Sequence, residues 1–190
     1  NCSLNGNAQY VLITHAHKDH LTGLTSSWNK GKIHCSHETR ALLLIEYPKL
    51  SHVIIGHDIG STFHLSCMAS PKRRGLRTKK RIYKDKISDR DSTSLDSEDE
   101  WLNDPSNGCE ITLFDSNHCY GSVMYLIKNG QNGRTYLHTG DFRYNARKFN
   151  FMDKLSNIWI DVLYFDATFC NDRLYFPTQK KVNKEFIKHL

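Results

Sequence analysis

Three histidines and one aspartate lie within six positions near the start of the chain, directly after the apolar run at residues 10–13. Alternate side chains of an extended segment leave on the same side, so His15, His17 and Asp19 can converge on one point while His20 reaches a neighbouring one. Imidazole nitrogens and carboxylate oxygens are ordinary zinc ligands, and one tetrahedral ion does not need this many from a single loop. The sequence therefore predicts a two-metal hydrolytic site.

Chance is the alternative explanation, because 11 of the 190 residues are histidine. A motif gains weight when its structural context is present, and here the ligands follow an apolar run that is typical of a buried strand. This context favours a metal site over a random cluster.

Two further ligand candidates follow predicted strands later in the chain. His118 comes after an expected strand at 111–114, and Asp141 comes after one at 135–138. Gly121 and Gly140 lie nearby and allow the backbone to approach a metal centre closely. A single His or Asp at either place would more often be structural, but together with the first motif they indicate one composite site.

Short apolar runs alternate with turn signals along most of the chain. They predict strands at 10–14, 32–35, 51–55, 62–66, 110–114, 122–127, 135–138 and 162–166. The pattern also predicts a helix at 37–47, with Ser36 as its N-cap and Pro48 after its end. A second helix is expected at 178–190, with one apolar face formed by Val182, Phe186, Ile187 and Leu190.

Residues 71–107 interrupt this pattern. Residues 72–86 contain nine Lys or Arg, and residues 89–104 then contain seven acidic residues among serines and threonines. Such a block buries too little apolar surface to offset its ordering entropy, so a disordered insertion between two strands is expected. Its basic clusters fit a nuclear-localisation signal or a nucleic-acid tether, or equally a solvated loop whose two halves partly cancel in charge.

Composition limits the class of protein. At 190 residues and 38% hydrophobic content, the chain is long enough for one domain with a core, and the missing initial Met suggests a fragment. The six cysteines form no Cys-x-x-Cys pair, which favours reduced thiols. A net charge of +6 favours a polyanionic partner. No apolar run approaches the ~20 residues that span a bilayer, so no membrane association is expected.

Several of these motifs occur together in one known family. Besides the His-rich loop, the segments 117–124, 137–143 and 163–170 resemble the metallo-β-lactamase superfamily, and within it the β-CASP nucleases of the DNA cross-link-repair group that includes Artemis. The resemblance implies an α/β fold, the N-terminal part of an αββα sandwich spanning residues 1–190, with a β-CASP cap expected beyond residue 190. Two departures are Tyr120, where the family usually has Pro, and the absence of an early Asp from residues 1–9.

The resemblance implies six metal ligands, which are His15, His17, Asp19, His20, His118 and Asp141. Three histidines (His15, His17 and His118) would hold one zinc ion, and Asp141 would bridge to a second held by Asp19 and His20. The expected catalytic residues are Asp19, Asp141 and Asp166: Asp19 beside the attacking water, Asp141 between the two ions, and Asp166 as an outer carboxylate. Asn117 and His138 would support the ligands. The other histidines, at positions 34, 37, 52, 57, 64 and 189, are expected to be surface or packed residues without clustered partners.

The function implied by the resemblance is a nuclear, zinc-dependent 5′-to-3′ DNA exonuclease that acts in interstrand cross-link and double-strand break repair. Its partners would be damaged, single-stranded or 5′-phosphorylated DNA, and other repair proteins. Three alternatives stay open. An RNA-processing β-CASP endonuclease tends to carry Glu where this chain has Asp166, a small-molecule metallo-β-lactamase-type hydrolase should lack that motif, and an inactive scaffold would lose ligands.

The composition of residues 71–107 leads to a first prediction. Deleting this block should leave the melting temperature nearly unchanged and weaken DNA binding only modestly, because it holds few apolar anchors. Thermal unfolding and DNA-binding titrations of the deletion variant check this, and a large loss of folding would show that the block belongs to the core.

Overall fold

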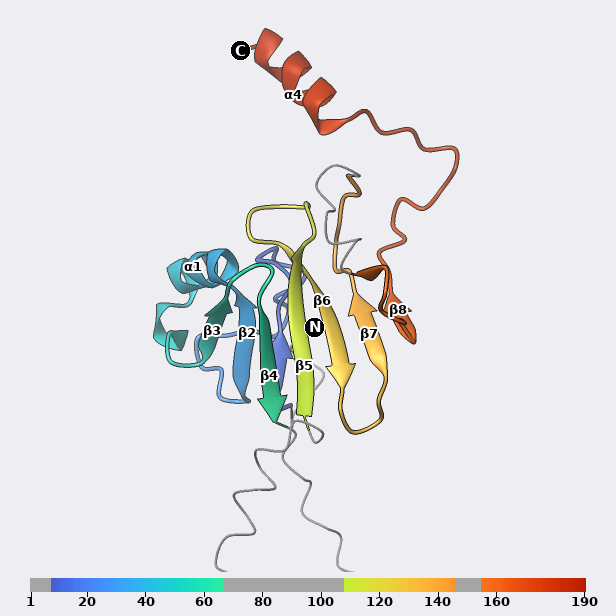
Figure 1. Cartoon of the computed structure of the whole chain (residues 1–190). Helices are drawn as coiled ribbons and strands as arrows, with labels where there is room; N and C mark the ends of the chain where they lie inside the picture. The colour runs from blue at the N-terminus through green and yellow to red at the C-terminus, as the bar shows by residue number, and fades with distance from the viewer. Residues whose placement is uncertain (1–7, 67–107, 146–154) are drawn as a thin grey trace, which may run out of the picture.

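The computed structural model describes residues 8–66, 108–145 and 155–190, which form two β-sheets that pack against each other (Figure 1). The prediction for residues 71–107 therefore lies outside the described residues. Ser66 and Gly108, the described residues on either side of positions 67–107, pair with each other at the ends of neighbouring antiparallel strands. Within the described ranges, no helix is both long and apolar enough to cross a membrane.

The smaller sheet contains three parallel strands in the order β1 (Tyr10–Leu12), β2 (Lys32–Ser36) and β3 (Ile54–His57). Parallel neighbours need a crossover connection, and helix α1 (His37–Glu46) with the 3-10 turn η1 (Pro48–Leu50) provides it between β2 and β3. The helix starts as predicted, because the Ser36 side chain accepts a hydrogen bond from the Thr39 amide at 3.0 Å. Apolar side chains of these elements form the first core cluster, which includes Ile33, Leu43 and Ile54.

The larger sheet contains five strands in chain order, which are β4 (Thr62–Ser66), β5 (Gly108–Asp115), β6 (Val123–Asn129), β7 (Thr135–His138) and β8 (Val162–Tyr164). The first four pair antiparallel, and β8 joins β7 in parallel. One face carries Ile111, Leu113, Val123 and Tyr125 toward the smaller sheet, and the other carries Phe114, Met124, Leu126 and Leu137 toward the segment 155–160. The predicted α/β class is therefore confirmed, with α1 and the segment 155–160 outside the two sheets (Figure 1).

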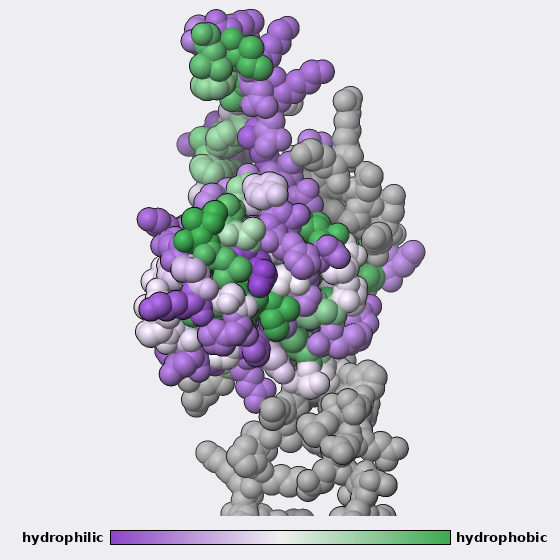
Figure 2. Space-filling view, turned by 90° about the vertical axis from the view of Figure 1, so that its left-hand side faces the viewer, coloured by the Kyte–Doolittle hydropathy of each residue, from purple (hydrophilic) through white to green (hydrophobic). Residues whose placement is uncertain are grey.

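All eight predicted strands are present, with shifts of up to three residues at their ends. The largest shift is at β3, because residues 51–53 form a turn in which the Val53 amide donates to Leu50 O. The C-terminal helix α4 (Gln179–Lys188) is slightly shorter than predicted and has no buried residue. Its apolar side chains stay exposed on a segment that projects away from the sheets (Figure 2).

One pair of histidines contradicts the expectation that the remaining imidazoles lack partners. His34 on β2 and His57 on β3 are 2.8 Å apart between Nδ1 and Nε2, and the Phe63 ring stacks against both. Burial lowers the pKa of His34 to about 4, so this side chain is neutral in the folded protein. The pair was missed because two separate strands supply it.

Tyr125 on β6 joins the two sheets. Its buried hydroxyl lies 2.8 Å from Ile13 O and 3.2 Å from His34 O, both in the smaller sheet or just beyond it. Two residues earlier, the Val123 amide donates to Thr14 O at 2.9 Å. The end of β1 is therefore fixed to the beginning of β6.

The strand registers place several strand ends at one edge of the larger sheet. Asp115 at the end of β5 pairs with Val123, and His138 at the end of β7 pairs with Tyr125 and with Tyr164 at the end of β8. The loops that follow β1, β5, β7 and β8 consequently meet at this edge.

Replacing Tyr125 by Phe should lower the free energy of unfolding by about 1–3 kcal/mol, because it removes a buried hydrogen-bond donor from the junction between the sheets. Tyr136→Phe is a matched control, since the hydroxyl of Tyr136 accepts a hydrogen bond from the exposed Asn132 side-chain amide at 3.1 Å. Chemical denaturation measures both variants. Equal losses in the two would contradict the role assigned to the Tyr125 hydroxyl.

Candidate metal centre

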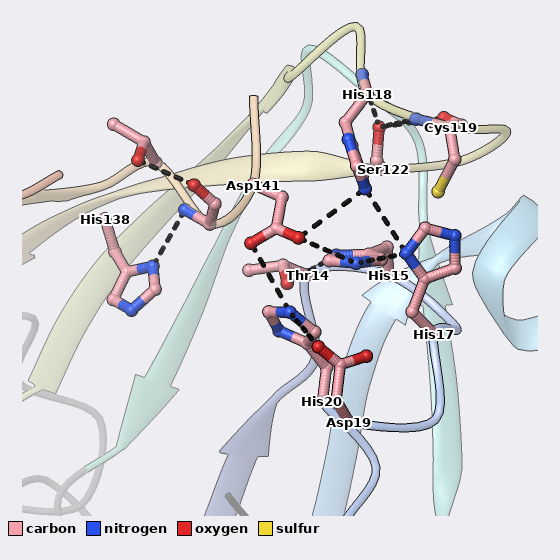
Figure 3. Close-up of polar contacts among 12 residues, drawn as sticks. Thr14, His15, His17, Asp19, His20, His118, Cys119, Ser122, His138 and Asp141 are labelled. Carbon is pink, nitrogen blue, oxygen red and sulfur yellow. Dashed lines mark hydrogen bonds and ion pairs between the residues drawn. The ribbon is translucent and has the colours of Figure 1, made fainter. Parts of the chain in front are cut away.

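Four of the six predicted ligands converge on one point. His15 and His17 follow β1, His118 follows β5 and Asp141 follows β7, and one ligand atom from each lies within 4.8 Å of the others (Figure 3). Residues that are more than 100 positions apart in sequence thus form one cluster. It is the only such group of three or more potential ligands found among the described residues.

Four of the six separations between these atoms are close to the spacing around a tetrahedral ion. His17 Nδ1 lies 3.1 Å from His15 Nε2 and 3.2 Å from His118 Nε2. Asp141 Oδ2 lies 3.7 Å from His15 Nε2 and 3.6 Å from His118 Nε2. Ligand atoms at about 2.0–2.1 Å from a tetrahedral zinc would be about 3.3 Å apart. Donor type and spacing therefore both fit a metal site of three imidazoles and one carboxylate.

The two oxygens of Asp141 face different groups. Oδ2 points toward His15 and His118, whereas Oδ1 lies 3.4 Å from His20 Nε2 (Figure 3). The same His20 nitrogen lies 3.5 Å from Asp19 Oδ2. His20 therefore lies beside both Asp19 and Asp141, and Asp141 lies between His20 and the ligand cluster. Among the described residues, Asp19, His20 and Asp141 do not form a second cluster of three converging ligand atoms.

His15 is the buried member of the centre, with 0% relative exposure. Burial, followed by the neighbouring His20, lowers its pKa to about 4, so the imidazole is neutral at physiological pH, as a metal ligand must be. Thr14 Oγ1 lies 3.0 Å from His15 Nδ1, which leaves Nε2 directed into the centre. Such outer contacts fix the orientation of a metal-binding imidazole.

Ser122 holds the backbone that carries His118. Its hydroxyl accepts hydrogen bonds from the amides of His118 at 3.2 Å and Cys119 at 3.0 Å. The same hydroxyl donates to Cys119 O at 2.8 Å. One small side chain therefore satisfies three backbone groups in the turn around the ligand.

Asn117 connects the His118 loop to the Asp141 loop. Its backbone has a positive φ of 54°, and its amide donates to Asp115 Oδ1 at 2.7 Å. Its side-chain Nδ2 donates to Arg143 O at 2.9 Å, while the Arg143 amide donates to Ser116 O. These contacts fit the supporting position expected for Asn117.

Gly140 brings Asp141 close to the first motif. Its φ is +54°, and a Cβ built on it would lie 2.9 Å from Thr14 Cγ2, so any other residue would be strained there and would push against Thr14. The Gly140 amide donates to His138 Nδ1 at 3.1 Å. His138 therefore lies where a residue that supports the Asp141 loop should be, and it is not part of the ligand cluster.

Asp166 lies outside the ligand cluster, in the loop after β8. Its amide donates to Thr139 Oγ1 at 3.1 Å, and that hydroxyl donates to Gly140 O at 2.7 Å. Hydrogen bonds from Thr168 hold the pKa of Asp166 below its usual value, so the carboxyl is ionised at neutral pH. Thr139 thus links the Asp166 segment to the Asp141 loop.

The sequence interpretation missed three hydroxyl residues that position the ligands, namely Thr14, Ser122 and Thr139. Each lies within four positions of a predicted ligand, so proximity in sequence was an available signal. Proximity alone does not show which backbone group a hydroxyl contacts.

Comparison with known proteins supports the resemblance, although no protein-family model matches the chain. DNA cross-link repair protein SNM1 of Arabidopsis thaliana is 30% identical over 183 residues, which cover 93% of this chain and 29% of that protein. 5′ exonuclease Apollo of Mus musculus is 29% identical over 183 residues, which cover 96% of this chain and 27% of that protein. Protein artemis of Gallus gallus is 29% identical over 182 residues, which cover 88% of this chain and 21% of that protein.

The chain spans less than a third of the length of each of these relatives. Among solved structures, a mutant of the CmlA beta-hydroxylase is similar with a TM-score of 0.47 and 14% sequence identity, covering 96% of this chain and 32% of that chain. The predicted kinship with the DNA cross-link-repair group is confirmed by the sequence relatives.

Metal content tests the ligand assignment directly. The protein should purify with zinc, and His17→Ala should lower the zinc bound per chain, because loss of one ligand weakens the site. His52→Ala is the matched control, since His52 is exposed and lies outside the cluster. Elemental analysis after dialysis gives the stoichiometry, and the assignment is wrong if His17→Ala retains as much zinc as the control.

Proposed function

We propose that this chain, a homologue of the DNA cross-link-repair nucleases over nearly its whole length, is the metal-binding catalytic part of a zinc-dependent DNA nuclease. The observation that carries the proposal is the position of Asp141, whose two oxygens face the ligand cluster on one side and His20, next to Asp19, on the other. Such paired sites are typical of enzymes that hydrolyse phosphodiesters. The biological setting would be interstrand cross-link and double-strand break repair in the nucleus.

The donor set supports zinc as the metal. Three imidazole nitrogens and a carboxylate oxygen within 4.8 Å of one another suit this ion, and His15 is already neutral, so it would release no proton on binding. When bound, two such ions would lower the pKa of a water molecule and stabilise negative charge on the phosphate.

The residues around the centre would orient the reactants. Asp19 is 80% exposed in its side chain and lies beside His20, so its carboxylate can accept a proton from the attacking water at the open side. Thr14 and Ser122 would keep His15 and His118 in place, and Asp166 would act from outside the ligand set through Thr139.

The open side of the centre is compatible with a large substrate. His17 and His118 are exposed while His15 is buried, so one side is protein and the other faces solvent. The net charge of +6 favours a polyanion such as DNA. Because one relative is named a 5′ exonuclease, we propose 5′-to-3′ degradation of 5′-phosphorylated strands. RNA cleavage is the alternative, and Asp166 in place of the Glu found in RNA-processing members favours DNA.

The reaction can be tested with Asp141→Asn in the full-length protein. This substitution keeps the side-chain shape but removes the charge that would balance two cations, so the rate should fall by at least ~10²-fold. The assay follows release of mononucleotides from 5′-phosphorylated single-stranded DNA. Asp172→Asn, an exposed carboxylate outside the cluster, should retain the wild-type rate.

Assays with two further substrates distinguish the alternative functions. RNA of the same sequence and the β-lactam nitrocefin should both be turned over poorly. Cleavage of RNA but not of DNA would refute the DNA-nuclease proposal, and full activity of Asp141→Asn would refute the two-metal arrangement.

A further inference from the structure

We infer that a pocket beside His118 is a nucleobase subsite in which Tyr120 stacks on the base next to the scissile phosphate. The inference rests on the proposed nuclease function and names a specificity element for it. Three observations support the inference. The pocket shares His118 with the candidate metal centre, and its carboxylates would repel a phosphate. The exposed aromatic ring of Tyr120 lines the pocket at a turn position whose backbone does not require an aromatic residue.

The pocket has a volume of about 380 Å³ and is lined by residues from α1, the loop after β3, the His118 loop and the start of α4, among them Glu38, Ile59, Asp115, His118, Tyr120 and Gln179. This volume lies within the range of roughly 300–1,000 Å³ that small-molecule sites occupy. Because His118 belongs to both the pocket and the ligand cluster, a group in the pocket lies directly beside the metal centre.

The charge of the pocket selects a base over a phosphate. Glu38 and Asp115 bring two carboxylates: Glu38 Oε2 is buried without a hydrogen-bond partner among the described residues, and Asp115 Oδ1 accepts from the Asn117 amide. Ionised carboxylates only accept hydrogen bonds, so they repel phosphate oxygens and suit the exocyclic amino groups of cytosine or adenine. Thymine lacks such an amino group. The sugar-phosphate backbone would therefore run along the metal centre while the base enters the pocket.

Tyr120 is an exposed aromatic residue that belongs to none of the core clusters, with 72% of its surface accessible. The Ser122 amide donates to Cys119 O at 3.1 Å and Gly121 has a φ of +74°, which together indicate a type II turn with Tyr120 at its second position. Pro is favoured at that position, so the backbone has no need of a tyrosine. An aromatic face at the rim of a pocket is what an unstacked base requires.

The test is equilibrium binding of a single-stranded, 5′-phosphorylated oligonucleotide with uncleavable phosphorothioate linkages. 2-Aminopurine at the proposed base position reports stacking by loss of fluorescence. Tyr120→Phe should bind like the wild type. Tyr120→Ala should bind about 5- to 100-fold more weakly, the effect expected for loss of one stacked base, and should lose the quenching. Tyr120→Pro should behave like Tyr120→Ala, because it keeps the turn and removes the ring.

A second variant tests whether Glu38 accepts a hydrogen bond from the amino group of the base. With unmodified oligonucleotides that differ only at this position, the wild type should prefer cytosine to thymine. Glu38→Gln should reduce that preference, since an amide can also donate to thymine. Melting temperatures within a few degrees of the wild type confirm that the variants are folded.

The outcomes separate the subsite from the nuclease function. If Tyr120→Ala and Tyr120→Pro bind and quench like the wild type, or cleave with an unchanged KM, the subsite is wrong even though the protein is a nuclease. If the wild type binds and quenches but cleaves no DNA, the nuclease proposal fails and the base-binding pocket stands.

Discussion

The metal centre depends on how the two sheets dock. His15 and His17 extend from the smaller sheet, whereas His118 and Asp141 extend from the larger one, so their separations follow from the contact between the sheets. That contact is made just below the ligands, by the Tyr125 hydroxyl on Ile13 O and by the Val123 amide on Thr14 O. Shifts of 1 Å are enough to impair a catalytic site, so hydrogen bonds one and two residues before His15 are well placed to prevent them.

The cluster of imidazoles is arranged to receive a cation and not protons. The ring centroids of His15 lie 4.6 Å from His17, 4.2 Å from His20 and 4.9 Å from His118, so protonating one ring places charge beside its neighbours. Burial adds to this effect and holds the pKa of His15 at about 4, although Asp141 acts in the opposite direction. A bound metal ion would resolve the conflict, because it would satisfy several neutral imidazoles and the carboxylate at once.

Local patterns in the sequence were sufficient for the strands, for the N-cap at Ser36 and for the grouping of potential ligands. They were insufficient for contacts between distant segments outside the predicted ligand cluster. His34 and His57 pair across β2 and β3, and Glu38 and Tyr120, which are 82 positions apart, line one pocket, so neither arrangement leaves a local signal. The β3 boundary was misplaced because Val53 has strand propensity but lies in a turn closed by Leu50. The supporting hydroxyls were missed for a similar reason, since their acceptors depend on loop geometry.

The two sides of the candidate metal centre differ in burial: one is enclosed by protein and the other is open to solvent. On the protein side, His15 is fully enclosed and held by Thr14, and Gly140 leaves no room for a side chain against Thr14. On the solvent side, His17, His118 and Asp19 are exposed, and the pocket with its two carboxylates begins at His118. In the proposed function, the buried side would fix the ligand positions. The open side would admit a nucleic-acid strand, with its phosphates attracted by bound cations and its base amino groups accepted by the carboxylates. The charges around the site would therefore set the orientation of the proposed substrate. Its phosphate would lie at the ligand cluster, and its base would lie in the pocket beyond His118.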